Sequence, residues 1–212
     1  MNNIISFINQ KGGCGKSTTC VHFVKWSVQC GIKVVLVDAD AQKSSSTWVT
    51  YLDIGVHTEI IQSPDELLDR IPEISKQCDL VVVDGAAGLS ESSRAILFRS
   101  KLTIVPCQPT GVDLHSASEA VRLIKQAQSV RSGQPNAVTF ISRATKGTKL
   151  LNEARSLMSK SGIKLLNTTI YQRQVVADTF GQSATVWDIQ SRAASQSARE
   201  YDRLFQEITN EL

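Results

Sequence analysis

The octapeptide Lys11-Gly12-Gly13-Cys14-Gly15-Lys16-Ser17-Thr18 follows closely on an apolar run from Ile4 to Ile8. Its glycines allow the backbone to turn tightly and to point several N–H groups toward one centre, and the helix expected next adds the positive end of its dipole. A strand, a glycine-rich turn and an amphipathic helix in this order predict a loop that binds phosphates. Lys16 would reach the β- and γ-phosphates of a nucleotide, and the Ser17 hydroxyl would bind the accompanying Mg²⁺.

This loop departs from the general phosphate-loop pattern. The first position of that pattern, usually a glycine, is Gln10, and a second lysine, Lys11, precedes Lys16 by five residues. In both respects the loop resembles the deviant Walker A box of the ParA/MinD family of P-loop ATPases, whose early lysine crosses a dimer interface to the phosphates held by the partner subunit. The resemblance implies ATP and Mg²⁺ as cofactors, residues 11–18 as the nucleotide-binding loop, catalytic roles for Lys11 and Lys16, and an ATP-dependent homodimer.

Length and composition limit the alternatives. A chain of 212 residues can bury a substantial core and is predicted to form one domain over residues 1–212. The net charge of +3 is too small to identify a nucleic-acid-binding protein, so DNA binding would need a local basic surface or a dimer. The five cysteines lack C-x-x-C spacing, which argues against disulfides and metal binding and favours a reducing cytoplasm. No run is long enough to span a membrane, and no signal peptide is predicted.

Apolar runs and helical periodicities alternate along the chain. Strands are predicted at residues 4–8, 33–37, 79–84, 102–106, 137–141 and 165–170, and residues 57–61 could form a short edge strand. Helices are predicted at residues 17–30, 64–77, 112–130 and 148–161, with a further helical stretch before residue 102 and a helix at the C-terminus. This alternation predicts an α/β fold of the P-loop NTPase type, in which helices cover both faces of a mostly parallel, doubly wound sheet.

Three aspartates follow or end predicted strands. Asp84 ends an apolar run, the place of a Walker B carboxylate that binds Mg²⁺ directly or through water. Asp38 and Asp40 are spaced so that both lie on one side of an extended segment. The corresponding segment of the ParA/MinD family reads Asp-x-Asp-Pro-Gln, with roles in metal coordination and water positioning, and here Ala41 replaces the proline. Asp38 and Asp84 are thus predicted metal ligands together with Ser17, and Asp38 and Asp40 are predicted catalytic residues. Which of these two orients water stays open.

The resemblance extends along the whole chain. Residues 105–113 resemble the family's Pro-x-x-Pro-x-x-x-Asp segment, and residues 170–186 resemble its closing, switch-like stretch. Ser142 and Arg143 lie where the family usually has an Asn-Arg pair near the adenine. Arg143 and Tyr171 are therefore predicted to contact the nucleotide. Because the phosphate loop begins so near residue 1, the chain resembles the short ParA type without an N-terminal helix-turn-helix domain.

The predicted C-terminal helix has one apolar stripe and charges of both signs elsewhere. The stripe consists of Tyr201, Leu204, Phe205, Ile208 and Leu212. A helix that lies on a membrane surface would carry an excess of Lys and Arg, so this helix is predicted to pack on the sheet. Arg192, Arg199 and Arg203 recur along the same segment. They could form a basic strip that contacts DNA phosphates, or a solvated face.

Together these features predict a ParA-type partition ATPase of the bacterial cytoplasm, associated with the nucleoid. The resemblance implies that two subunits close on ATP and Mg²⁺, bind DNA without sequence preference, and hydrolyse ATP when a ParB-like or adaptor protein on the cargo stimulates them. The cargo would be a plasmid or a chromosome locus. The alternatives are a McdA-like ATPase that positions carboxysomes on the nucleoid, a MinD-like membrane ATPase, which the C-terminal helix argues against, and a metabolic P-loop enzyme. A metabolic ligase would not need Lys11, and a metabolic reductase would need cysteines that bridge a cluster between subunits, for which no Cys here has the expected setting.

Overall fold

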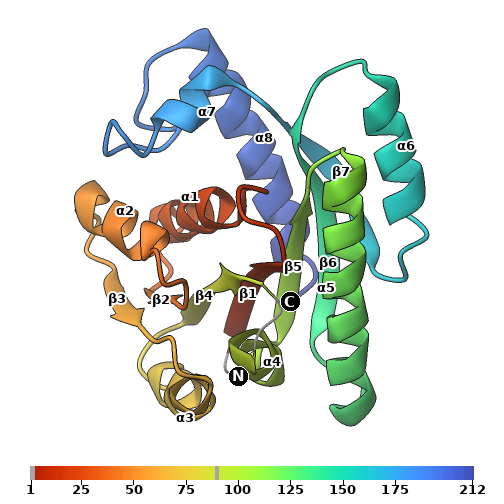
Figure 1. The fold of residues 1–212 in the computed structure, drawn as a ribbon. Coiled ribbons are helices and arrows are strands. Elements are labelled where there is room, and N and C mark those ends of the chain that lie inside the picture. The colour runs from red at the N-terminus through yellow and green to blue at the C-terminus, as the bar shows by residue number, and fades with distance from the viewer. Residues whose placement is uncertain (1–2, 89–90) are drawn as a thin grey trace.

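The centre of the computed structural model, which describes residues 3–88 and 91–212, is a sheet of seven strands in the order β3-β2-β4-β1-β5-β6-β7 (Figure 1). Every neighbouring pair is parallel. The strands are β1 (Asn3–Asn9), β2 (Val34–Asp38), β3 (His57–Ile60), β4 (Leu80–Ala87), β5 (Leu102–Cys107), β6 (Asn136–Ala144) and β7 (Lys164–Tyr171). The predicted fold class is confirmed, and the pairing is parallel throughout.

Helices cover both faces of this sheet. They are α1 (Lys16–Gln29), α2 (Ser44–Leu52), α3 (Pro64–Ile74), α4 (Glu91–Arg99), α5 (Gly111–Val130), α6 (Lys149–Met158), α7 (Gln174–Asp178) and α8 (Arg192–Thr209). Sequence periodicity did not predict α2 and α7. Helix α2 begins with three serines, which are poor helix formers, and it is held in place because Trp48 and Val49 are buried. Helix α7 has only five residues and buries none of them.

Two apolar layers lie on opposite faces of the sheet. The helices α3, α4, α5 and α6 pack on one face, and α1, α2 and α8 pack on the other. The apolar stripe of α8 is buried as predicted, through residues such as Leu204 and Phe205. Strand β1 is buried on both faces from Ile4 onward, as expected for the central strand of a parallel sheet. No helix in the described ranges is long and apolar enough to cross a membrane.

The carboxyl end of β1 is the point at which the chain reverses its direction of winding. Strand β1 lies between β4 and β5, with β2 and β3 on one side and β6 and β7 on the other. At such a point the connections on either side diverge, and they leave a crevice in which sheets of this kind bind ligands. The glycine-rich loop connects β1 to α1 at this crevice. The topology therefore places the loop beside the segments that follow β2, β4, β5 and β6.

Gly85 allows β4 and β1 to approach closely beyond Asp84. Strand β4 runs to Ala87, so the small residues 85–87 that follow Asp84 belong to the strand. A Cβ atom at Gly85 would lie 2.9 Å from the carbonyl oxygen of Phe7, which is closer than a real side chain is found. Glycine at this position therefore serves packing between the two strands as well as flexibility.

His22 lies inside an aromatic cluster that joins α1 to α8. Its ring stacks on Tyr201 with centroids 4.5 Å apart, and Trp48 and Trp187 lie 5.6 and 5.7 Å away. Its Nδ1 lies 2.7 Å from the carbonyl oxygen of Thr18, and its Nε2 accepts the Val186 N–H at 3.3 Å. A carbonyl can only accept and an N–H can only donate, so the proton of the neutral ring is on Nδ1. Burial lowers the pKa of His22 from 6.5 to about 4.

We predict that the contribution of His22 to the stability of the protein falls as the pH is lowered from 6.5 to about 4, whereas the raised pKa of Asp84 shifts stability in the opposite direction as the pH falls below about 7. The unfolded chain takes up a proton on His22 in this window and the folded chain does not, so stability that is fully present above pH 6.5 is lost progressively, by about 3 kcal/mol in total. Urea titrations followed by tryptophan fluorescence give the slope of stability against pH. Relative to the parent, His22→Gln should lose less stability, or gain more, as the pH is lowered through this window, whereas replacement of the exposed His115 by Gln should leave the slope unchanged. Equal slopes in both variants would contradict the assignment.

Candidate nucleotide-binding site

The loop between β1 and α1 borders a cavity of about 470 Å³. Gly13 and Gly15 have φ angles of 78° and 95°, in the left-handed region that favours glycine, and Gly15 directly precedes α1. The cavity is lined by many of the residues predicted for nucleotide binding and by Asp40, which was predicted to be catalytic. These are Gly12, Gly13, Gly15, Lys16, Ser17, Thr18, Asp40, Arg143 and Tyr171. The structure therefore brings together residues from the ends of β1, β2, β6 and β7.

Side chains from β6 and the β5–α5 loop hold the carbonyl groups of the glycine-rich loop. Gln108 Nε2 and Arg143 Nη1 both donate to the carbonyl oxygen of Gly13, at 2.7 and 2.6 Å. The Ser142 hydroxyl donates to the carbonyl oxygen of Cys14 at 2.6 Å. Sequence reasoning missed the role of Gln108, because a glutamine after a strand carries no signal for a partner 95 residues away. Ser142 and Arg143, expected near an adenine, here fix the conformation of the phosphate loop.

Cys14 occupies the variable position of the loop and is fully buried. Its thiol donates to the carbonyl oxygen of Lys11 at 3.3 Å, and burial raises its pKa above the ordinary value for cysteine. A buried thiol of this kind is a poor nucleophile. Cys14 therefore contributes packing and a hydrogen bond within the loop, and its side chain does not line the cavity.

The two lysines of the loop have different environments. Lys16 lines the cavity, is 6% exposed, and its Nζ donates to the carbonyl oxygen of Lys11 at 3.2 Å. Lys11 does not line this cavity, and its Nζ lies 2.8 Å from Oδ2 of Asp113 at the start of α5. Asp113 is fully buried and also accepts a hydrogen bond from the Thr110 hydroxyl, while its Oδ1 has no partner among the described residues. Lys11 is therefore held beside its own phosphate site and not in it.

Asp38 is fully buried and bound to the backbone. Its Oδ1 accepts the Asp40 N–H at 3.0 Å, and its Oδ2 accepts the Ser46 N–H at 2.8 Å. These bonds shape the segment after β2 and position the first turn of α2. Asp38 does not line the cavity. In this conformation its geometry is that of a carboxylate that organises a loop.

Asp84, paired with Asp38 in the register of β2 and β4, is also fully buried. Neither of its carboxylate oxygens has a hydrogen-bond partner among the described residues. Burial raises the pKa of Asp84 to about 7, an effect that the nearby Asp38 charge reinforces and the hydroxyls of Ser17 and Ser45 oppose. A buried carboxylate with free oxygens beside a serine hydroxyl is a suitable donor set for Mg²⁺, which prefers oxygen ligands. No group of three or more His, Cys, Asp or Glu in residues 3–88 and 91–212 could hold a metal alone, so phosphate oxygens and water would complete its shell.

Of Asp38 and Asp40, it is Asp40 that lines the cavity. Its Oδ1 accepts the Gln42 N–H at 2.9 Å, and its Oδ2 accepts the Ala87 N–H at 3.2 Å. Asp40 thereby connects the segment after β2 to the end of β4. A carboxylate at the rim of a phosphate site can accept a hydrogen bond from an attacking water molecule. The structure thus gives Asp38, Asp84 and Asp40 three different environments.

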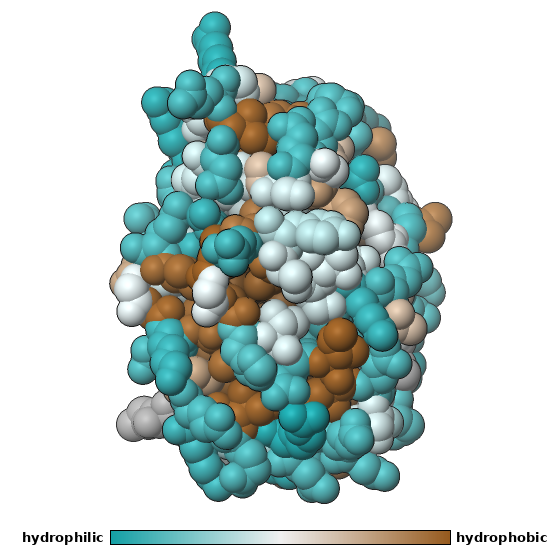
Figure 2. Space-filling model, turned by 90° about the vertical axis from the view of Figure 1, so that its left-hand side faces the viewer, coloured by the Kyte–Doolittle hydropathy of each residue, from teal (hydrophilic) through white to brown (hydrophobic). Residues whose placement is uncertain are grey.

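The wall of the cavity opposite the loop is partly aromatic and was not predicted. It includes Trp48 from α2 and Phe180 after α7, whose rings are 5.6 Å apart in an edge-to-face arrangement. Phe180 is 42% exposed, and Tyr51 of α2 lies 6.3 Å from it. Figure 2 shows the side of the molecule that carries α2 and β3, where hydrophobic patches are interspersed with polar residues. Short or serine-rich helices give little periodicity, so these residues had no signal in the sequence.

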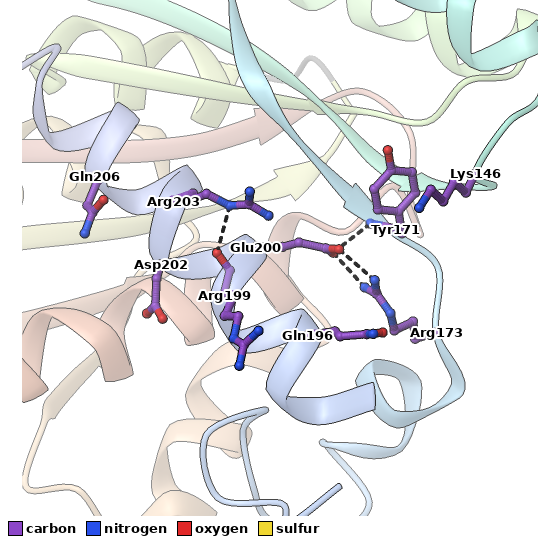
Figure 3. A pocket seen from close by; sticks show the side chains of 9 residues that line it. All are labelled: Lys146, Tyr171, Arg173, Gln196, Arg199, Glu200, Asp202, Arg203 and Gln206. Atoms are coloured by element: carbon purple, nitrogen blue, oxygen red, sulfur yellow. Dashed lines mark hydrogen bonds and ion pairs between the residues drawn. The ribbon is translucent and has the colours of Figure 1, made fainter. Parts of the chain in front are cut away.

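The three arginines predicted for DNA contact are exposed on α8. Arg199 and Arg203 line a second cavity together with Lys146 and Arg173, and Figure 3 shows them on successive turns of the helix. Arg192 begins the helix and lies outside this cavity. The structure therefore brings two of the three arginines into one basic surface.

Comparison with known proteins identifies the family. The model of the CobQ/CobB/MinD/ParA nucleotide binding domain matches residues 5–186. The chain belongs to this family. It is 25% identical to maintenance of carboxysome distribution protein A of Gloeobacter kilaueensis, over 97% of this chain and 93% of that protein. It is 21% identical to protein ParA of Rhizobium radiobacter, over 92% of this chain and 90% of the relative. The structure of apo McdA from Cyanothece superposes with a TM-score of 0.81 at 12% identity, covering 98% of this chain and 99% of that one.

We predict different costs for neutralising the two neighbouring aspartates. Asp38→Asn replaces one acceptor by a donor beside two backbone N–H groups, so the buried mismatch should cost about 1–3 kcal/mol of stability. Asp40→Asn should cost less than Asp38→Asn, because Asp40 is only partly buried and water can replace a backbone N–H partner that the amide leaves unpaired. Stability is measured by urea denaturation at pH 6, which is below the pKa of about 7 for Asp84. Asp84 is then largely protonated, so Asp38→Asn gains little stability from removing the repulsion between the two carboxylates. Equal losses in the two variants would show that Asp38 does not organise the loop.

Proposed function

We propose that this protein is a ParA-type partition ATPase that works as an ATP-dependent dimer. The observation that carries the proposal is the position of the two lysines. Lys16 lines the cavity of the phosphate loop, whereas Lys11 lies outside it with 38% of its side chain exposed. A lysine that its own site does not use is available to the phosphates of a second subunit. Closing two subunits face to face would let each Lys11 exchange Asp113 for the partner's nucleotide.

The residues around the cavity support ATP hydrolysis with Mg²⁺. Ser17 and Asp84 would hold the metal, which would supply positive charge to neutralise the phosphates. Lys16 would bind the same phosphates, and the loop that Gln108 and Arg143 fix would supply backbone N–H groups. Asp40 would orient the attacking water. Asp38 would contribute by holding Asp40 in place through the Asp40 N–H.

DNA binding is proposed for the dimer and not for the single chain. A net charge of +3 gives one subunit a weak attraction for duplex DNA, because affinity rises with the number of phosphates neutralised. A two-fold dimer presents Arg192, Arg199 and Arg203 twice. We propose sequence-independent binding to the nucleoid in the bacterial cytoplasm, and hydrolysis stimulated by a ParB-like partner bound to a plasmid or a chromosome locus. The single domain over residues 1–212 is part of this proposal.

The second candidate is positioning of carboxysomes on the nucleoid. It is supported by the 25% identity to a maintenance of carboxysome distribution protein along nearly the whole chain. This alternative keeps the ATP cycle and changes only the cargo and the adaptor. The neighbouring genes distinguish the two, because a carboxysome adaptor or a ParB-like gene would lie beside this one. We do not propose a MinD-like membrane role, since the apolar stripe of α8 is buried inside the protein.

We predict that the two lysines separate nucleotide binding from dimerisation. Lys16→Ala should abolish ATP binding, because the loop loses the charge that balances two phosphates. Lys11→Ala should bind ATP nearly as well as the parent but should neither dimerise nor bind DNA. Calorimetry measures the affinity for ATP, and light scattering measures the fraction of dimer. Fluorescence anisotropy measures the binding of two unrelated labelled DNA duplexes. DNA binding that is equal in ATP and ADP, or an unaffected Lys11 variant, would remove the dimer-clamp proposal.

A further prediction concerns hydrolysis. Asp40→Ala should retain ATP and slow its turnover by a factor of about 10²–10⁴, the contribution of a positioned acid–base group. The ATP-bound variant should accumulate as a dimer. Asp65→Ala, an exposed carboxylate in the first turn of α3, is the matched control. Parent-like turnover in the Asp40 variant, measured by phosphate release with Mg²⁺, would exclude Asp40 as the residue that orients water.

A further inference from the structure

The segment that carries Asp40 is held in place by hydrogen bonds more than by burial. Ala41, Gln42 and Lys43 are all exposed, so packing does little to fix the turn that follows β2. Position 41 is an alanine, which leaves φ free where a proline would restrict it. A carboxylate that orients a water molecule needs a fixed position. The bonds that hold this segment from other parts of the chain therefore decide how well Asp40 can perform that role.

Asp40 is bound both within its own segment and from two neighbouring segments. Within the segment, its N–H donates to Asp38 Oδ1 and its Oδ1 accepts the Gln42 N–H. From the end of β4, the Ala87 N–H donates to Asp40 Oδ2 at 3.2 Å. From the segment after β3, Gln62 Nε2 donates to the carbonyl oxygen of Asp40 at 3.4 Å. The carboxylate is thus held from the side of β4, and the peptide group behind it from the side of β3.

Gln62 lies on a part of the backbone that is itself well fixed. The preceding residue, Ile61, is fully buried, and its N–H donates to the carbonyl oxygen of Asp38 at 3.1 Å. The following residue, Ser63, is the N-cap of α3. The carbonyl oxygen of Gln62 also accepts the hydroxyl of Ser92, in the first turn of α4, at 2.9 Å. The backbone on either side therefore gives the Gln62 side chain a stable base from which to reach Asp40.

We propose that Gln62 is a positioning residue for ATP hydrolysis, which holds the backbone of Asp40 so that its carboxylate can orient the attacking water. The inference rests on the proposed role of Asp40. Gln62 does not line the cavity of the phosphate loop, so it acts through Asp40 and not on the nucleotide. Its bond to Asp40 is long and exposed to solvent, so its contribution is that of one ordinary hydrogen bond, about three- to tenfold in turnover.

Gln62→Met tests this role, because methionine keeps the length of the side chain and removes the N–H donor. At saturating ATP and Mg²⁺, turnover measured by phosphate release should fall about three- to tenfold, while KM for ATP should stay within about twofold of the parent. Ser92→Ala should slow turnover by a smaller factor, because it loosens the backbone of Gln62. Gln77→Met is the matched control, an exposed glutamine just after α3, and should change neither parameter.

The decisive measurement combines Gln62→Met with Asp40→Ala in single-turnover hydrolysis of ATP. When the carboxylate is absent, loss of its support should slow hydrolysis by no more than about a further twofold. A general structural defect would slow the reaction equally in both backgrounds. An equal loss in both backgrounds, or a raised KM with parent turnover, therefore overturns the positioning role. Circular dichroism establishes that each variant is folded.

The same variants separate this inference from the proposed function. Hydrolysis that is slowed by Asp40→Ala but unchanged by Gln62→Met overturns the role of Gln62 alone. A parent that does not hydrolyse ATP, or an Asp40→Ala variant as fast as the parent, overturns the proposed role of Asp40 and the inference with it.

Discussion

The phosphate loop depends on the central position of β1 in the sheet. The loop has few apolar atoms and cannot hold its own shape, so its carbonyl oxygens need partners from other segments. Gln108 after β5 and Arg143 at the end of β6 both reach Gly13, and the Gly88 N–H after β4 reaches the carbonyl oxygen of Gln10. Only the carboxyl end of a central parallel strand lies within reach of all these segments. The order of the strands is therefore a condition for the geometry of the site.

The same arrangement divides the acidic residues by burial. Asp38 and Asp84 lie side by side in the sheet, yet Asp38 is saturated by backbone N–H groups and Asp84 has no hydrogen-bond partner among the described residues. Burial raises the pKa of Asp84, and repulsion between the two adjacent carboxylates adds to this rise, while the nearby charge of Lys16 opposes it. A metal ion at Asp84 would relieve this repulsion. Asp40, nearer to solvent, is left for chemistry at the rim of the cavity.

Helix α8 is joined to the nucleotide site by two different kinds of contact. On its buried side, Tyr201 stacks on His22, whose ring binds the carbonyl of Thr18 in the first turn of α1. On its other side, Glu200 holds Arg173 from the segment after β7. The first contact is apolar and rigid, and the second is an ion pair near solvent. The two contacts thus tie α8 both to the first turn of α1 and to the segment after β7.

The sequence by itself determined the phosphate loop, the parallel α/β fold and most strands and helices, because these features depend on local chemistry. Glycines permit positive φ angles, and apolar runs predict buried strands whatever their neighbours are. The tertiary structure alone decided which partner each charged residue has. Lys11 meets Asp113 across 102 positions, and the different roles of Asp38 and Asp40 follow from the N–H groups that each one meets after folding. Helix α2 also escaped prediction, because the burial of Trp48 and Val49 outweighs its weak local propensity, and α7 escaped prediction because five residues give too little periodicity. The partners and the burial of these charged residues are set by the order of the strands, which no local sequence pattern encodes.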